Sequence, residues 1–205
     1  MAEELLPSRA ALLELRDDRE VMQAGQAFLD EKRTLIAATL VQMLQRHVAL
    51  EARFRAAFIE AADALRTALA RHGLEALQAY PREPLPLAEL VFSPSELLGV
   101  ALLEARLKLD LDEADGEQED GIRSVQAERC RQRFAELLPI AVELAALESN
   151  LRRLYDEFRK TERRASALED VLIPELDNQL RGLEELLEAQ EIEEAVRVRV
   201  KRSAG

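Results

Sequence analysis

The sequence has few of the residues on which compact cores, disulfides and membrane spans depend. Its 205 residues include one cysteine, no tryptophan and 4% aromatic residues. The single cysteine, Cys130, excludes an intramolecular disulfide and suits a reducing compartment. The longest uncharged run, Thr34 to Gln45, is 12 residues long, well short of the roughly 20 that span a bilayer. We therefore expect no direct membrane insertion, so any association with a membrane must go through a partner.

Motifs for nucleotide binding, metal binding and export are also missing. Neither G-x-x-x-x-G-K-[ST] nor G-x-G-x-x-G occurs, so nucleotide binding has no motif support. His47 and His72 lie too far apart on one predicted helix to share a metal ion, and the acidic residues between 110 and 120 do not follow the EF-hand spacing. The N-terminus is acidic and lacks the basic region of an export signal. We expect a cytoplasmic chain with no catalytic residue, no cofactor and no metal site.

The negative charge is concentrated in the middle of the chain. The formal net charge is -12, yet residues 1–72 hold 10 basic and 11 acidic side chains and residues 122–205 hold 15 and 17. Residues 73–121 hold 3 basic and 12 acidic side chains. Because nucleic-acid binding needs clustered, uncompensated cations, these counts argue against nucleic acid as a partner. We expect an acidic loop near residues 110–120.

Two long stretches with heptad spacing are the clearest pattern that is present. In the first, apolar residues recur every seven positions, at Leu15, Met22, Leu29, Ile36, Met43 and Leu50. In the second, the seam alternates in steps of three and four, at Leu137, Ile140, Leu144, Leu147, Leu151, Leu154, Phe158, Thr161, Ala165, Leu168 and Leu172. Such spacing is typical of one helix wound on another. We predict an all-α fold, a long antiparallel two-helix coiled coil with a small middle head.

The predicted boundaries follow the turn-forming residues. The N-terminal helix is expected within residues 1–72, with Ser8 as a candidate cap and Gly73 as its end. The C-terminal helix is expected within residues 122–205, behind the possible cap Asp120 and reaching about Arg197. If the chain folds back near residue 97, Arg9 lies near Glu185. About the last 15 to 20 residues of the second helix then extend beyond the start of the first helix without a partner, because both helices rise by about 1.5 Å per residue.

The head, residues 73–121, carries a strand signal. Apolar and charged residues alternate from Leu103 to Asp112, and a period of two is typical of a β-strand. The apolar run from Leu87 to Phe92 can supply the partner strand, although the sequence between the two runs can also be helical. We therefore expect a short β-hairpin in the head.

Both helices depart from the heptad rhythm at one place. The first steps by fours at Leu50, Phe54, Phe58 and Ala62, and the second at Leu168, Leu172, Leu176 and Leu180. Such stutters locally unwind a left-handed supercoil. Pro174 lies in the second stutter and lacks a backbone donor, so we predict a helix kink there. Gly25 is predicted to allow close helix packing opposite Ala165 to Leu168, with partner binding as the alternative role.

Residues at both ends of the chain carry a family resemblance. The N-terminal arm contains Pro7-Ser8-Arg9, Leu12-Leu13, Leu15, Ala24-Gly25, Leu29 and Glu31-Lys32-Arg33. The C-terminal arm contains Thr161 to Glu169, Val171, Ile173-Pro174, Leu186-Leu187-Glu188 and Arg197 to Lys201. Together these segments resemble the two signatures of the D subunit of the V/A-type (vacuolar/archaeal-type) rotary ATPases, the central-stalk shaft.

The resemblance implies a non-catalytic rotor component that couples ATP hydrolysis or synthesis to proton or sodium transport. It implies as partners the catalytic and regulatory subunits of a threefold ring, the small F subunit of the stalk, and a funnel-shaped subunit linking to the membrane rotor. It also implies a location peripheral to the membrane through that complex. The alternative from the residues alone is a free-standing coiled-coil scaffold or a membrane-associated interaction protein.

Six basic residues are candidates for contact between the shaft and the ring: Lys32, Arg33, Arg159, Lys160, Arg163 and Arg164. The competing interpretation is a solvated face that pairs with its own acidic residues. Arg152 with Asp156, and Arg153 with Glu157, have the i,i+4 spacing of such pairs. The sequence leaves both interpretations open.

Overall fold

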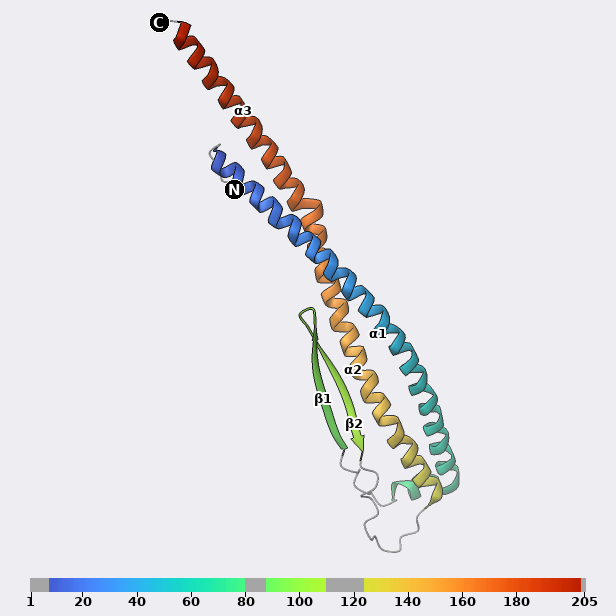
Figure 1. The fold of residues 1–205 in the computed structure, drawn as a ribbon. Helices are drawn as coiled ribbons and strands as arrows, with labels where there is room; N and C mark the ends of the chain where they lie inside the picture. The colour runs from blue at the N-terminus through green and yellow to red at the C-terminus, as the bar shows by residue number, and fades with distance from the viewer. Residues whose placement is uncertain (1–7, 80–87, 110–123, 204–205) are drawn as a thin grey trace. The chain divides into compact units, whose positions relative to one another are not determined.

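The computed structural model describes residues 8–79, 88–109 and 124–203. Its elements in chain order are α1 (Arg9–Gln78), β1 (Ala88–Leu97), β2 (Val100–Leu109), α2 (Val125–Ala167), the π-helix η2 (Leu168–Leu172) and α3 (Ile173–Ser203) (Figure 1). The helical class and the middle β-hairpin are therefore confirmed. Pro7, the possible cap Asp120 and the acidic loop expected near 110–120 lie outside the described residues.

Serine side chains cap the two long helices at their N-terminal ends. The Ala11 N–H donates to Ser8 Oγ at 3.1 Å, and the Ala127 N–H donates to Ser124 Oγ at 3.3 Å. The bond at Ser8 agrees with the predicted cap, and the second cap places the start of α2 at Val125. Each bond satisfies one of the backbone donors that a helix leaves unpaired in its first turn.

The first helix is interrupted at its predicted end, whereas the last helix runs past its predicted end. Gly73, predicted to end the first helix, has φ 74° and ψ 167°, and helical geometry resumes beyond it up to Gln78. A positive φ is the conformation that glycine adopts at little cost. At the far end α3 continues to Ser203 instead of stopping near Arg197.

The chain forms two compact units, and α1 contributes to both. The first unit consists of Met1–Leu35 and Phe158–Gly205, and the second of Ile36–Glu157. In the first unit the N-terminal part of α1 packs antiparallel to η2 and α3. Its core cluster contains Ala11, Leu15, Leu180 and Leu183, with Leu12, Leu176 and Leu187 packed around it.

In the second unit the rest of α1 packs against α2, and alanines form much of the seam. Ala61 and Ala68 are buried at 0% and 1% exposure, whereas Phe58 is 50% exposed and Leu65 is 39% exposed. The least exposed positions continue the heptad without a break, at Leu50, Phe54, Ala57, Ala61, Ala64 and Ala68. The stutter predicted in the first helix is therefore wrong. From Ala57 to Ala68, α1 therefore places alanines in this interface, and not the large apolar Phe58 and Leu65.

The stutter predicted in the second helix takes the form of a π turn. The N–H of Ile173 bonds to the carbonyl of Leu168, an i to i−5 bond, and η2 ends there. Leu172, predicted in the seam, is 41% exposed. The half-buried Ile173 takes its place. A π turn holds one residue more than an α turn, so the seam resumes one residue late.

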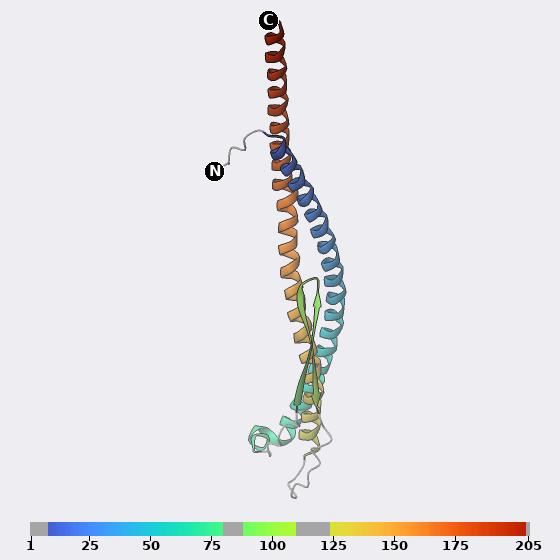
Figure 2. The same ribbon diagram turned by 60° about the vertical axis from the view of Figure 1, so that its left-hand side comes forward.

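The β-hairpin belongs to the second unit and is longer than predicted. β1 and β2 pair antiparallel from Ala88 opposite Leu109 to Leu97 opposite Val100. Leu98 and Gly99 connect them with φ values of 52° and 83°. Positive φ at both central residues is the geometry of the tight turns that suit the twist of hairpin strands. In Figures 1 and 2 the hairpin lies alongside α2.

Candidate functional site

The six basic candidates all lie in the first unit, on α1 and on the last turns of α2. Arg159, Lys160, Arg163 and Arg164 are exposed, and they flank the buried Thr161 and Ala165. The Arg163 Nε–H donates to the carbonyl of Arg159 at 3.2 Å, and this acceptor carries no charge to compensate the guanidinium. We call the four arginine and lysine side chains of residues 159–164 the basic α2 surface.

The two candidates on α1 are more engaged within the chain. Arg33 Nη2 lies 3.1 Å from Asp30 Oδ1, one helical turn away. Lys32 is half-buried and also makes an intramolecular interaction. The self-paired interpretation therefore fits Arg33 better than it fits the basic α2 surface.

The ion pairs predicted near the basic candidates form differently. Arg152 pairs with Glu148, four residues before it in the helix, at 3.5 Å. The predicted partner, Asp156, lies four residues after it. Arg153 Nη1 donates to the carbonyl of Ala101 in the hairpin at 3.1 Å. The i,i+4 rule allows a partner on either side, and the hairpin offers a carbonyl that sequence spacing does not reveal.

Ion pairs between α1 and α3 show the register of the first unit. Arg9 pairs with Glu191 and Arg16 pairs with Glu184, each at 2.6 Å, and Arg19 pairs with Asp177 at 2.5 Å. The partner predicted for Arg9 was a residue near Glu185, so the register is displaced. The extra residue of η2 contributes to this displacement. All three pairs place the arginine on α1 and the carboxylate on α3.

Gly25 lies opposite Leu168, within the segment predicted for it. A Cβ atom at position 25 would lie 3.9 Å from Leu168 Cδ1, which is ordinary van der Waals contact. Helix packing therefore leaves room for alanine at this position. Pro174 is the second residue of α3, two positions after Leu172, the last residue of η2. The residue without a backbone N–H therefore lies next to the point where the α-helical bonding pattern changes.

Asn150 attaches the hairpin to α2, and the heptad pattern did not single it out. Its Nδ2 donates to the carbonyl of Leu103 at 2.9 Å, and the Leu103 N–H donates to its Oδ1 at 2.9 Å. Asn150 is only 4% exposed. An asparagine directly beside the seam residue Leu151 was the available signal, because a buried amide must find hydrogen-bond partners.

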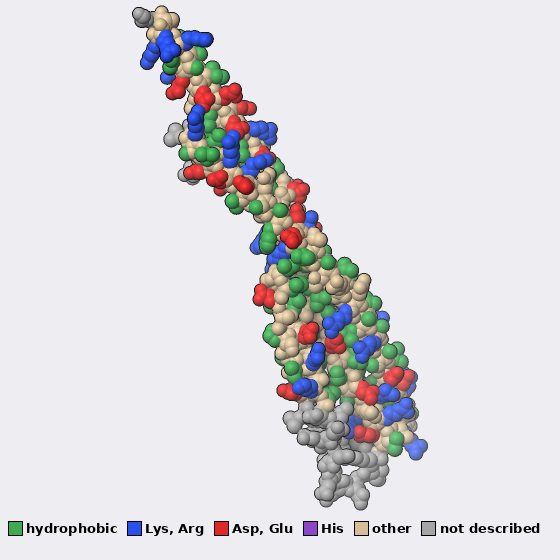
Figure 3. Space-filling model, in the orientation of Figure 1, with side chains coloured by type: hydrophobic (Ala, Val, Ile, Leu, Met, Phe, Trp, Pro, Cys, Tyr) green, Lys and Arg blue, Asp and Glu red, His purple; other side chains and the backbone are tan. Residues whose placement is uncertain are grey.

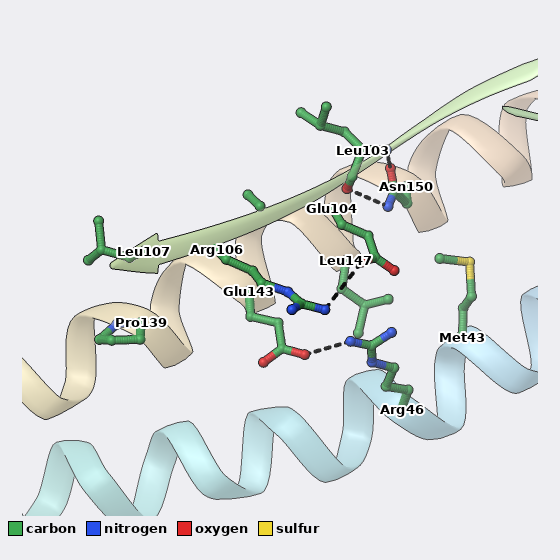
Figure 4. A pocket seen from close by; sticks show the side chains of 11 residues that line it. Met43, Arg46, Leu103, Glu104, Arg106, Leu107, Pro139, Glu143, Leu147 and Asn150 are labelled. Carbon is green, nitrogen blue, oxygen red and sulfur yellow. Dashed lines mark hydrogen bonds and ion pairs between the residues drawn. The ribbon is translucent and has the colours of Figure 1, made fainter. Parts of the chain in front are cut away.

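A cavity of about 400 Å³ lies between β2, α1 and α2 beside this attachment. Figure 4 shows Glu104 and Arg106 of β2 on one side, and Arg46 of α1 and Glu143 of α2 on the other. Arg46 pairs with Glu143 at 2.6 Å, and Arg106 lies 3.8 Å from Glu104. Because each of these two cations has a carboxylate beside it, the charges that line the cavity compensate one another.

The described residues contain neither a metal cluster nor a membrane span. Among residues 8–79, 88–109 and 124–203, no group of three or more His, Cys, Asp or Glu side chains is placed to hold a metal ion. No helix in the same ranges is long and apolar enough to cross a bilayer.

Known proteins resemble the chain over nearly its whole length. The sequence profile of the ATP synthase D subunits matches residues 11–203. The D subunit of the V-type ATP synthase of Thermotoga neapolitana is 25% identical over 193 residues, covering 94% of each chain. The D subunit of the A-type ATP synthase of Pyrococcus horikoshii is 27% identical, covering 94% of this chain and 91% of its own. The D subunit of the V-type ATP synthase of an Anaeromyxobacter species is 29% identical, covering 94% and 90%.

Proposed function

Because the chain belongs to the family of ATP synthase D subunits, we propose that it is the central-stalk rotor component of a V-type ATPase or ATP synthase. In this role it performs no catalysis itself. It couples ATP hydrolysis or synthesis in a threefold catalytic ring to proton or sodium transport, by rotating inside that ring. The profile match over residues 11–203 is the observation that carries the proposal.

The construction of each unit is compatible with such a role. A rotor that couples three equivalent sites must present a different surface to each of them. Each unit is built on two antiparallel helices, and a pair of helices has no threefold symmetry. Rotation would therefore change the contacts that each site receives, and a difference in contacts is what shifts an equilibrium between open and closed states.

The proposed partners are those of a central stalk. They are the catalytic and regulatory subunits of the ring, the small F subunit of the stalk, and a funnel-shaped subunit that links to the membrane rotor. The chain would then be peripheral to the membrane through this complex. Within the ring, the basic α2 surface is the proposed contact, because its cations are exposed and would suit an acidic loop of a ring subunit.

Reconstitution of the complex with and without this chain tests the proposed role. We expect the chain to co-purify with the ring, and ATP-driven ion pumping to be lost when the chain is omitted. A free-standing scaffold would neither co-purify with the ring nor affect pumping, and that result would refute the proposal.

A charge reversal tests the proposed contact separately. We expect Arg163→Glu with Arg164→Glu to lower pumping per ATP hydrolysed while the complex still assembles. Arg181→Glu is the matched control, because Arg181 is an exposed arginine of α3 in the same unit and outside the basic α2 surface. Equal effects of the double variant and the control would refute a specific contact at residues 163 and 164.

A further inference from the structure

The β-hairpin is attached to α2 through the residues of β2 that lie nearest the turn. Asn150 bonds to both backbone groups of Leu103, and Arg153 donates to the carbonyl of Ala101. Val100, the first residue of β2, is also buried. We call residues 100–103 the attached segment, because these contacts hold the hairpin at one end of its length.

The other end of the hairpin has weaker contacts. Ala105 is the last buried residue of β2. Beyond it, residues 106–109 and their partners 88–91 on β1 are half-buried or exposed, and we call them the open end. Among the described residues, the open end makes no hydrogen bond or ion pair with α1 or α2. Segments with few buried contacts move at low cost in free energy, so the open end can move while the attached segment stays in place.

The cavity beside the hairpin gives this movement a direction. It separates β2 from α1 and α2 and has a volume of about 400 Å³. In Figure 4 Glu104 lies on the side of Arg46, and Arg106 lies on the side of Glu143, across the cavity. Each of these facing pairs joins opposite charges. In the described structure, however, Arg46 pairs with Glu143 and Arg106 with Glu104.

We propose that the hairpin has a second, closed position, in which it turns about Leu103 and the open end settles over the cavity. In that position Arg106 pairs with Glu143, and Glu104 pairs with Arg46. The present contact of Arg106 with Glu104, at 3.8 Å, is too long for a charge-assisted hydrogen bond, so little is lost in the exchange. Glu143 can also keep Arg46, because an ionised carboxylate accepts through two oxygens. The closure is a hinge movement about a few residues of one element.

The open and closed positions are expected to coexist. The four charged side chains are each at least 40% exposed, and exposed ion pairs contribute little stability. Neither position is therefore strongly favoured. The share of the closed position should fall as salt screens the charges. A partner that contacts the hairpin in one position only would shift the balance toward that position.

The charge pattern favours internal pairing over a charged ligand. In Figure 3 basic and acidic side chains are interspersed over the hairpin and the helices beside it. The cavity itself is lined by two cations and two carboxylates, so a ligand of either charge would meet like charges there. The side chains of β2, in contrast, match those of α1 and α2 charge for charge. The closure does not depend on the rotary role.

Distance measurement by double electron–electron resonance on the full chain tests the closure. Spin labels are attached through Ala88→Cys at the open end and Ala52→Cys on α1, both exposed positions, with Cys130→Ser to remove the native thiol. We expect two populations of distance, and the shorter one should grow as salt is lowered from about 0.5 to about 0.05 M. A single distance that salt does not change would overturn the proposal.

A charge exchange on β2 tests the facing pairs. Glu104→Arg with Arg106→Glu keeps the contact within the strand but places like charges across the cavity, so the shorter population should fall about threefold or more. Glu89→Lys with Lys108→Glu is the matched control, because this pair of the same hairpin lies 4.0 Å apart and does not line the cavity. Equal effects of the two exchanges would overturn the proposal.

A compensating exchange on the helices completes the test. Arg46→Glu with Glu143→Arg, added to the exchanged hairpin, restores opposite charges across the cavity and should restore the shorter population. Failure to restore it would overturn the proposed pairing. Amide exchange at Leu103 should stay slow in every variant, because its bonds to Asn150 persist in both positions. Fast exchange at Leu103 would show that the hairpin detaches, and that result would overturn the turning point.

Discussion

Asn150 of α2 pairs with both backbone groups of Leu103 on β2. The Leu103 N–H donates to Asn150 Oδ1, and Asn150 Nδ2 donates to the Leu103 carbonyl, each at 2.9 Å. The amide thus takes the place that a third strand would occupy at the edge of β2. Pro94 lies opposite Leu103 in the hairpin. A residue without an N–H is tolerated there because the backbone groups of this pair point away from the partner strand.

Asn150→Ala should destabilise the attachment of the hairpin. The change leaves the N–H and the carbonyl of Leu103 without their partners, and unsatisfied buried backbone groups cost about 1–3 kcal/mol. We expect a decrease of about 2 kcal/mol in the free energy of unfolding in urea, and faster amide exchange at Leu103. Asn178→Ala is the control, because Asn178 is exposed and accepts from Arg181 on its own helix. An unchanged exchange rate at Leu103 would contradict the attachment.

Deletion of Asp170 should be tolerated although it lies inside a long helical segment. The seam passes from Leu168 to Ile173 through the extra residue of η2, and loss of one residue restores heptad spacing across this point. We expect nearly unchanged helicity and melting temperature by circular dichroism. Deletion of Glu162, in an uninterrupted part of the seam, should lower the melting temperature strongly. Equal losses from both deletions would show that η2 does not absorb a residue.

Pro174→Ala should alter coupling more than helix content. Alanine supplies the missing backbone N–H, which favours α-helical bonding where η2 now ends. The far-ultraviolet circular dichroism should therefore stay nearly the same. If the shape of this segment matters to the proposed rotor, ions pumped per ATP should change in the reconstituted complex. Unchanged pumping would count against a mechanical role for the predicted kink.

Gly25→Ala should stabilise the chain. Alanine is favoured over glycine in a helix interior by about 1 kcal/mol, and the added Cβ would lie at an ordinary distance of 3.9 Å from Leu168. We expect the free energy of unfolding to rise by up to about 1 kcal/mol. A loss of stability would show that the helices approach more closely at Gly25 than this distance indicates.

Ala61→Leu should destabilise the second unit far more than Phe58→Ala. Ala61 is 0% exposed in the seam, and added methylenes in a packed interface cost about 1–3 kcal/mol. Phe58 is 50% exposed, and its ring stacks on Phe54 with centroids 6.3 Å apart. Loss of this contact should cost no more than about 1.5 kcal/mol. Urea unfolding of both variants compares the two costs, and the reverse order would place Phe58 in the seam.

The kinds of element follow from the sequence by itself. A repeat of seven predicts a coiled-coil helix and a repeat of two predicts a strand, because each period keeps apolar side chains on one face of one backbone geometry. These periods predicted the two helical arms and a hairpin in the head. The segments around Pro7 and Thr161 also indicated the family of ATP synthase D subunits, which the profile match confirms. The six basic candidates also came from the sequence, and the charge reversal at Arg163 and Arg164 tests the proposed contact.

Tertiary structure decided which residues meet. Spacing alone does not distinguish Ala61 from Phe58, because the distance between the helix axes selects which side chain fits the seam. The partner of Arg9, the exposure of Leu172 and the attachment through Asn150 share this dependence. Each depends on the position of a second element. Small differences in helical rise and twist add up over the many residues between the two elements, so local spacing does not give that position. Local periodicity specifies the form of a helix, but only packing against that second element determines its register and its contacts.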